Sequence, residues 1–388
     1  MSMFIPYGRQ EILQEDIDAV VAVLQSDFLT QGPAVTRFEK LIAEATKARH
    51  AIAMNSATSA LHAACAALGV SQGDLVWTSP ISFVASSNCA LYCGAEVDFV
   101  DIDPATFNMC PKALAAKLEE AKAAGRLPKV VIPVHLCGQP CDMAAIGELA
   151  KKYGFKVIED ASHAIGGRYR DEPVGACAHS DIAVFSFHPV KIVTTAEGGC
   201  ATTQDDELAA ALERFRTHGI TRDPNLMENA SDGPWYYEQI DLGYNYRMTD
   251  LQAALGCSQM QRLDGMVARR HELAERYDTL LADLPLDLPF RHSDGYSGFH
   301  LYVVQLKLNE IEKSHLEVFE QWRAAGLGVN LHYIPIYRQP HYAKMGFDKA
   351  GFPNAEDYYS RSISIPLYHG MSDAQQEVVV DTLHETLR

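Results

Sequence analysis

Short apolar runs alternate with longer stretches of helical pattern from about Phe38 to Thr217. Such runs between helical stretches are typical of strands buried on both faces of a parallel sheet. The predicted helices are 38–48, 57–68, 84–93, 111–124 and 143–153, and the predicted strands are 51–54, 75–78, 96–100, 129–134 and three that contain Val157, Ile182 and Cys200. The pattern therefore predicts an α/β fold with a mostly parallel central sheet and helices on both faces.

The alternation stops after Thr217, where a long connector spans residues 222–243. Long irregular segments inside a compact chain are usually functional or disordered. This one contains the run Trp235-Tyr236-Tyr237, and disordered segments are poor in aromatic residues. We therefore expect a functional role for the connector.

A helical pattern from 249 to 284 follows the connector and is ended by Pro285. Beyond it, the pattern predicts strands at 301–306, 328–333 and 364–367 and helices at 312–325, 354–361 and 372–387. A chain of 388 residues is too long for one ordinary core. We therefore expect a large domain at 1–248, which includes the N-terminal segment, and a smaller α+β domain at 249–388.

Composition restricts the compartment and the kinds of site. No apolar run is long enough to span a bilayer, and the first residues lack the basic and apolar parts of a signal peptide. Nine cysteines are scattered through predicted core elements, which fits a reducing compartment. The pairs Cys89/Cys93 and Cys137/Cys141 have neither a second pair nor a histidine partner at zinc spacing. We expect a cytoplasmic protein without disulfides or a metal site.

The formal net charge of −17 argues against a nucleic-acid partner, because phosphate backbones are bound by clustered lysine and arginine. The same charge repels anionic substrates at long range. A nucleotide-linked substrate would therefore need local cationic groups for its diphosphate.

Two chemically capable residues follow predicted strands and lie 31 positions apart. Asp160 ends the run that contains Val157, and Lys191 follows the run that contains Ile182. Ligands of open α/β sheets collect outside the carboxyl ends of the strands. A lysine desolvated there becomes able to form a Schiff base with an aldehyde, and an acid nearby suits the pyridine nitrogen of pyridoxal phosphate. The pair predicts a pyridoxal-phosphate site with Lys191 and Asp160 as catalytic residues.

Plainer interpretations exist for each residue alone. Most loop lysines are solvated, and most aspartates at strand ends cap a helix or a turn. The alternation also fits a nicotinamide-dependent dehydrogenase, but no G-x-G-x-x-G follows any predicted strand. Instead, Asn55-Ser56-Ala57-Thr58-Ser59 opens an alanine-rich helix whose free amides favour an anion.

Four separated sequence motifs follow one another along the chain. They are Phe28-Leu29-Thr30-Gln31-Gly32-Pro33, Val157-Ile158-Glu159-Asp160-Ala161-Ser162-His163-Ala164, Ser186-Phe187-His188-Pro189-Val190-Lys191 with Thr195-Ala196-Glu197-Gly198-Gly199, and Gly243-Tyr244-Asn245-Tyr246-Arg247-Met248-Thr249-Asp250. With them the chain resembles the DegT/DnrJ/StrS family of sugar aminotransferases over nearly its whole length. One departure is Ala196, where glycine is expected.

The resemblance implies a fold-type I pyridoxal-phosphate enzyme and a homodimer with shared active sites. The implied cofactor contacts are Ala57, Thr58, Phe83, Asp160, His163, Ser186 and Lys191, with Asn245 supplied across the dimer interface. Phe83 would stack on the pyridine ring, and His163 would orient Asp160. The implied sugar contacts are Tyr7, His188, His332 and Tyr333.

Within the family, four segments look most like the PseC-type branch of pseudaminic acid synthesis. They are Ile5-Pro6-Tyr7-Gly8-Arg9-Gln10, His188-Pro189-Val190-Lys191, Trp235-Tyr236-Tyr237-Glu238 and His332-Tyr333-Ile334-Pro335-Ile336-Tyr337. That branch implies transfer of an amino group from L-glutamate to the 4-keto carbon of a UDP-linked 2-acetamido-2,6-dideoxy-4-hexulose. The product is UDP-4-amino-4,6-dideoxy-N-acetyl-β-L-altrosamine. The residue spacing does not separate UDP from dTDP or GDP, or this sugar from another 4-keto or 3-keto deoxysugar.

Two further interpretations remain open. A 3-dehydratase branch of the family has histidine in place of the Schiff-base lysine, and Lys191 argues against it. A non-catalytic pyridoxal-phosphate binder that acts as a regulator would need an added interaction module, and none is evident in the sequence.

Overall fold

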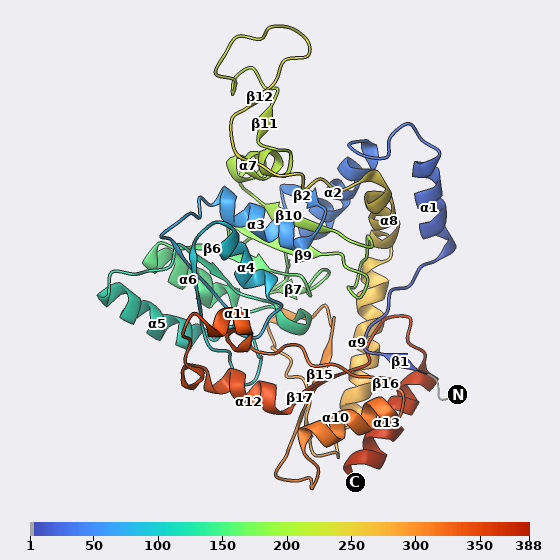
Figure 1. Ribbon diagram of the computed structural model, residues 1–388. Helices are drawn as coiled ribbons and strands as arrows, with labels where there is room; N and C mark the ends of the chain where they lie inside the picture. The colour runs from blue at the N-terminus through green and yellow to red at the C-terminus, as the bar shows by residue number, and fades with distance from the viewer. Residues whose placement is uncertain (1–3) are drawn as a thin grey trace.

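The computed structural model describes residues 4–388 and has a seven-stranded mixed sheet at its centre (Figure 1). Its strands are β2 (His50–Met54), β3 (Leu75–Thr78), β4 (Glu96–Phe99), β5 (Val130–Ile132), β6 (Lys156–Asp160), β9 (Ile182–Ser186) and β10 (Gly199–Thr203). They lie in the order β2-β10-β9-β6-β5-β3-β4. Only β10 runs antiparallel to its neighbours in this sheet. The predicted α/β fold with a mostly parallel sheet is confirmed.

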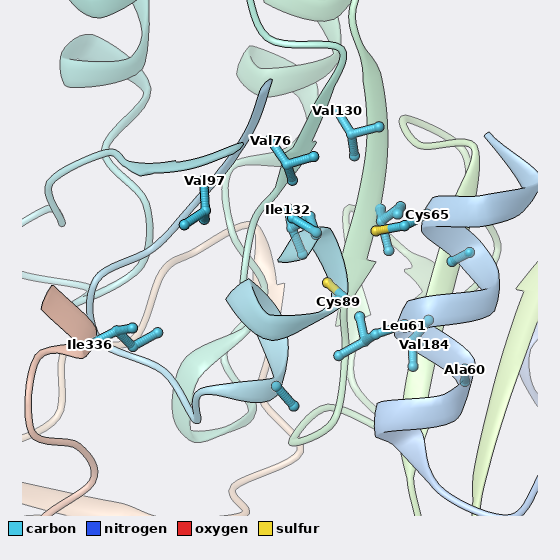
Figure 2. Close-up of a cluster of buried hydrophobic side chains, with 14 of the residues drawn as sticks. Ala60, Leu61, Cys65, Val76, Cys89, Val97, Val130, Ile132, Val184 and Ile336 are labelled. Atoms are coloured by element: carbon cyan, nitrogen blue, oxygen red, sulfur yellow. The ribbon is translucent and has the colours of Figure 1, made fainter. Parts of the chain in front are cut away.

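Three helices cover one face of this sheet, namely α3 (Ala57–Ala67), α4 (Ala85–Tyr92) and α7 (Asp206–Arg216). Successive strand residues point to opposite faces, so alternate positions of each strand meet these helices. Val76 and Ile132 thus pack in one buried cluster with Leu61 of α3 and Cys89 of α4 (Figure 2). Each fully buried side chain of this size contributes roughly 1.5–3 kcal/mol to folding.

The intervening strand residues meet a second set of helices on the opposite face. Trp77 and Val131 pack with α5 (Pro111–Ala123) and α6 (Met143–Tyr153). Ala53 and Phe185 pack with α2 (Pro33–Thr46) and α8 (Asp250–Met260). α1 (Gln14–Leu24) joins α8 through the buried Asp16, whose Oδ2 accepts from Gln259 Nε2 (2.8 Å). The sheet is therefore covered on both sides, as a parallel sheet requires.

α9 (Leu263–Leu280) leads from α8 into the C-terminal part of the fold (Figure 1). There it packs with α10 (His315–Ala324) and α13 (Asp373–Leu387) on an antiparallel sheet of β13 (Leu286–Asp287), β15 (Tyr302–Leu306) and β17 (Ser362–Ile365). β1 (Ile5–Pro6) pairs in parallel with β16 (Leu327–Gly328), and Ile5 is buried in the same cluster. The predicted domain boundary between residues 248 and 249 stays a prediction.

The remaining elements are short. β7 (Arg168–Tyr169), β8 (Glu172–Pro173) and β14 (Gly295–Tyr296) form a small sheet, and α11 (Pro340–Ala343), α12 (Pro353–Arg361) and the 3₁₀ turns Leu136–Gly138, Ile336–Arg338 and Lys349–Gly351 complete the chain. β11 (Ile220–Thr221) and β12 (Glu238–Gln239) pair at the base of a loop that projects away from the sheet at the top of Figure 1. We call residues 220–239 the arm; its Trp235 and Tyr237 are exposed.

The structure differs from the predicted elements in several places. The helical pattern at 249–284 forms two helices, because α8 ends at Met260 and α9 begins at Leu263. The predicted strand 328–333 is wrong beyond Gly328, where only an isolated bridge from Asn330 to Ser364 continues it. α1 and α7 are not among the predicted elements. Among residues 4–388, no helix combines the length and apolar character needed to cross a membrane.

Candidate active site

Asp160 and Ser186 lie at the carboxyl ends of two neighbouring parallel strands, β6 and β9. Asp160 is in register with Val184, and Ala161 N donates to Val184 O (2.8 Å). Ser186 is in register with Gly199 at the start of β10. These strand ends therefore meet at one edge of the sheet, as the sequence pattern predicts.

The buried carboxylate of Asp160 accepts two hydrogen bonds. Ser86 Oγ donates to Oδ2 (2.6 Å), and Ser162 N donates to Oδ1 (3.1 Å). The backbone is fixed as well, since Asp160 N donates to Pro133 O (2.9 Å). Asp160 is thus held in one orientation at the strand end, ready to pair with a cationic group.

Lys191 lies in the loop between β9 and β10, and its backbone amide donates to His188 O (2.9 Å). Burial lowers the pKa of Lys191 to about 8, although the negative charge of Asp160 opposes the shift. An ordinary lysine stays protonated up to a pH of about 10.4. Lys191 is therefore able to supply a neutral, nucleophilic amine at mildly alkaline pH.

The first turn of α3 offers free backbone amides beside Ser186. Ser56 Oγ accepts from Ser59 N (3.1 Å), while the amides of Ala57 and Thr58 have no acceptor within the part of the chain that the structure describes. Gly199 packs directly on the Ala57 amide, and a Cβ atom there would clash with it. Free amides at the positive end of a helix form a cradle suited to a phosphate.

His163, Tyr333 and Phe83 come together from three separate parts of the chain. His163 Nδ1 accepts from Cys137 N (3.2 Å), so the ring proton lies on Nε2, 3.3 Å from Tyr333 Oη. The ring centres of Phe83 and Tyr333 are 6.2 Å apart, and Phe83 is 58% exposed. Burial and the charge of Lys191 hold the pKa of His163 well below its ordinary value. The group is uncharged and presents an aromatic face to solvent.

His332 and Tyr7 lie next to this group. The ring centre of His332 is 4.8 Å from that of Tyr7 and 5.0 Å from that of Tyr333. Burial and the charge of Lys191 lower the pKa of His332 to about 3. Tyr7 is placed by β1, and its amide donates to Gly328 O (3.1 Å). Three of the four predicted sugar contacts, Tyr7, His332 and Tyr333, thus lie together.

His188 and Asn245 are exposed. His188 belongs to the turn that precedes Lys191. The backbone of Asn245 lies beside the start of α3, because Asn245 O accepts from Asn55 Nδ2 (3.4 Å). The roles predicted for these two side chains stay predictions.

Sequence reasoning missed two residues of this site, Ser86 and His300. Ser86 contacts Asp160 from a position 74 residues away, and a serine at the start of a helix carries no signal of such a contact. The His300 ring centre is 4.4 Å from that of His163. The hydrogen bonds to the Asp160 carboxylate therefore come from Ser86 and Ser162, whereas His163 bonds Cys137 and Tyr333.

These groups fit the chemistry of pyridoxal phosphate. The α3 cradle suits its phosphate, the Lys191 amine its aldehyde and the Asp160 carboxylate its pyridine nitrogen. Phe83 offers an aromatic face at the same site. No group of three or more potential metal-ligating side chains occurs within residues 4–388.

Two relatives align with this chain over almost its full length. The spore coat polysaccharide biosynthesis protein SpsC of Bacillus subtilis is 39% identical over 99% of this chain and 97% of its own length. The UDP-4-amino-4,6-dideoxy-N-acetyl-beta-L-altrosamine transaminase of Campylobacter jejuni serotype O:2 is 37% identical, again over 99% and 97%.

Solved structures are similar in fold over the same extent. Helicobacter pylori PseC, an aminotransferase involved in the biosynthesis of pseudaminic acid, matches with a TM-score of 0.90 and 30% identity over 99% of both chains. The pyridoxal-phosphate form of the sugar aminotransferase Spr1654 from Streptococcus pneumoniae matches with a TM-score of 0.88 and 28% identity, over 99% of this chain and 98% of that one. The model of the DegT/DnrJ/EryC1/StrS aminotransferase family matches residues 10–384. The aminotransferase chemistry inferred from Lys191 and Asp160 thus agrees with the comparisons, and this chain belongs to the DegT/DnrJ/EryC1/StrS aminotransferase family.

Proposed function

We propose that this sugar aminotransferase uses pyridoxal phosphate to move the amino group of L-glutamate to the 4-keto carbon of a UDP-linked 2-acetamido-2,6-dideoxy-4-hexulose. The product is UDP-4-amino-4,6-dideoxy-N-acetyl-β-L-altrosamine. The observation that carries the cofactor assignment is the half-buried Lys191, with its lowered pKa, beside Asp160 and the α3 cradle. The names of the Campylobacter relative and the Helicobacter structure support the substrate.

Each residue has a distinct task in this proposal. Pyridoxal phosphate, when bound, supplies an electron sink that makes the α-proton of the amino donor removable. Lys191 would hold the cofactor at its aldehyde carbon, and its free amine would remove the α-proton of the bound glutamate. In the second half of the cycle the same amine would deliver a proton to C4 of the sugar. Asp160 stabilises positive charge on the pyridine nitrogen by a charge-assisted hydrogen bond.

The surrounding residues bind the cofactor and the sugar. Ala57, Thr58 and Ser186 bind the cofactor phosphate, Phe83 stacks on its ring, and His163 packs nearby. Tyr7, His188, His332 and Tyr333 contact the sugar. Because His332 stays neutral at physiological pH, it recognises the sugar as a hydrogen-bonding group and not as a cation. The net charge of −17 makes tight binding of the diphosphate depend on cationic groups close to the site.

The visible absorbance spectrum tests both half-reactions. We expect a yellow protein that loses its band on addition of L-glutamate and regains it when the UDP-linked 4-keto sugar is added. The dTDP- and GDP-linked sugars serve as comparison substrates. A protein that stays colourless with added pyridoxal phosphate would contradict the cofactor assignment and, with it, the proposed function. Recovery of the band only with a dTDP- or GDP-linked sugar would redirect the substrate assignment.

The proposed catalytic unit is a homodimer. Asn245 is exposed beside the α3 cradle, and the arm projects away from its own sheet with Trp235 and Tyr237 exposed. Both features suit segments that complete the site of a second copy. Sedimentation analysis of the holoenzyme tests this, and an active monomer would contradict it.

A further inference from the structure

A chain of two buried serine hydroxyls leads to the Asp160 carboxylate from the start of α4. Ser86 Oγ lies 2.6 Å from Asp160 Oδ2, and Ser82 Oγ lies 2.6 Å from Ser86 Oγ. Ser86 has no exposed surface, and Ser82 is 3% exposed. Buried hydroxyls are costly unless they are hydrogen-bonded, so this chain fixes both serines.

The direction of the two hydrogen bonds follows from the number of protons. A carboxylate only accepts, so the single proton of Ser86 goes to Asp160. The Ser86 hydroxyl also lies 3.2 Å from Phe83 O, which is a longer and uncharged contact. With its proton committed, Ser86 accepts from Ser82. Ser82 therefore sets the orientation of the hydroxyl that meets Asp160.

The other oxygen of the same carboxylate is held by the Ser162 amide at 3.1 Å. One donor on each oxygen fixes the plane of the carboxylate, and the backbone bonds of Asp160 N to Pro133 O and His135 N to Asp160 O fix the strand beneath it. Each oxygen retains a lone pair for a further donor. Truncating Ser86 leaves the backbone untouched and frees only the side-chain plane.

We propose that Ser86, oriented by Ser82, is a positioning residue that aims the Asp160 carboxylate at the pyridine nitrogen of the cofactor. This inference rests on the proposed function, in which Asp160 partners that nitrogen. Hydrogen bonds to a charged group contribute about 1.5–3 kcal/mol. Losing the alignment is expected to weaken cofactor binding about tenfold to a hundredfold, since each 1.4 kcal/mol is a factor of about ten.

The chain offers a matched control in the next residue. Ser87 has no exposed surface, lies in the same turn of α4 and donates to Tyr342 Oη (2.7 Å) instead of to Asp160. Ser87→Ala therefore reports the cost of losing a buried hydroxyl at this place without any effect through Asp160.

The test compares the isosteric variants Ser86→Val and Ser86→Thr, which differ in the hydroxyl alone. The dissociation constants of pyridoxal phosphate and of 1-deazapyridoxal phosphate, an analogue that lacks the pyridine nitrogen, are measured on the cofactor-free protein. We expect Ser86→Val to raise the dissociation constant of pyridoxal phosphate about tenfold or more, while the analogue binds as it does to wild type. Ser86→Thr and Ser87→Ala bind both compounds like wild type.

The possible failures can be told apart. Equal losses for both compounds in Ser86→Val, or no loss for either, overturn the positioning role and leave the cofactor assignment intact. Wild type that binds neither compound overturns the proposed function and this inference together. If Ser86→Val does not fold, Ser82→Ala decides, because it removes an atom and adds none. Ser82→Ala is expected to bind pyridoxal phosphate a few-fold more weakly than wild type and to bind the analogue as wild type does. If the dissociation constants of the two compounds change by the same factor, or neither changes, the proposal is contradicted.

Discussion

At the residue scale, the pKa of Lys191 is set by burial, which lowers it, and by Asp160 and Cys137, which raise it. Burial disfavours its charged form, the nearby Asp160 favours it, and burial is the larger effect. The amine is therefore half neutral at a pH of about 8, well below the value of an ordinary lysine. In the window between these two values the unfolded chain holds a proton that the native protein has released, so the contribution of this group to stability rises with pH.

This shift predicts the pH dependence of cofactor capture. The rate at which the cofactor-free protein forms a borohydride-trappable adduct with pyridoxal phosphate should rise with pH and reach half its maximum at about pH 8. Lys191→Arg, which keeps the charge, should show no adduct at this position by peptide mapping. A midpoint at the pH of an ordinary lysine would contradict the lowered pKa.

Ala196 has a φ of 65°, in the left-handed region that favours glycine. The strain of a side chain there, about 1–2 kcal/mol, offsets the usual benefit of alanine over glycine. We expect Ala196→Gly to leave the thermal midpoint unchanged or raise it by a few degrees. Ala201→Gly, in the buried strand β10, should lower it. Clear destabilisation by Ala196→Gly would show that the loop carries no strain.

The alternation of runs alone indicated Asp160 and Lys191 at strand ends and an anion site at the start of the helix that contains Ala57 and Thr58. The other predicted contacts, such as Phe83 and Tyr333, came only from the family resemblance. Neither signal indicated Ser86 and His300, because their partners Asp160 and His163 are remote in the chain and a buried serine or histidine has the same local pattern whether or not it meets a site.

At the scale of elements, β10 and α3 fit closely together at the site. Gly199 leaves no room for a Cβ atom against the Ala57 amide. Gly199→Ala should push the first turn of α3 away and weaken the binding of both pyridoxal phosphate and inorganic phosphate. Isothermal titration calorimetry measures the two affinities. Gly265→Ala, in α9 with open space around its Cβ position, is the control. Unchanged phosphate binding in Gly199→Ala would show that the α3 start is not the phosphate site.

The elements of the central sheet were predictable because buried parallel strands are short, continuous apolar runs, such as β3 and β6. The break between α8 and α9 was not predictable, because the residues between the two helices, Gln261 and Arg262, include neither glycine nor proline. The predicted strand at 328–333 failed because only Val329 packs into the C-terminal core, whereas His332 and Tyr333 lie at the site and do not pair in a sheet.

At the scale of the whole molecule, Asn245 tests the proposed sharing of sites between two copies. Asn245→Ala should increase the loss of pyridoxal phosphate on dialysis, since one phosphate ligand would be missing from each site. Asn309→Ala, at an exposed loop of the C-terminal part, should retain the cofactor. A mixture of Asn245→Ala with Lys191→Ala subunits should regain up to a quarter of wild-type activity only if the side chain acts across the interface. Retention like wild type in Asn245→Ala would contradict the role.

The pairing of β1 with β16 has a consequence for how the enzyme is made. Tyr7 reaches the site only after Ile5 and Pro6 have paired with Leu327 and Gly328. During synthesis the central sheet is complete once β10 has left the ribosome, and domains fold as they emerge. Ile5 and Pro6 must then stay unpaired until β16 has been translated, more than a hundred residues after β10. A ribosome-bound nascent chain can therefore possess Lys191, Asp160 and the α3 cradle and still lack one wall of its sugar site.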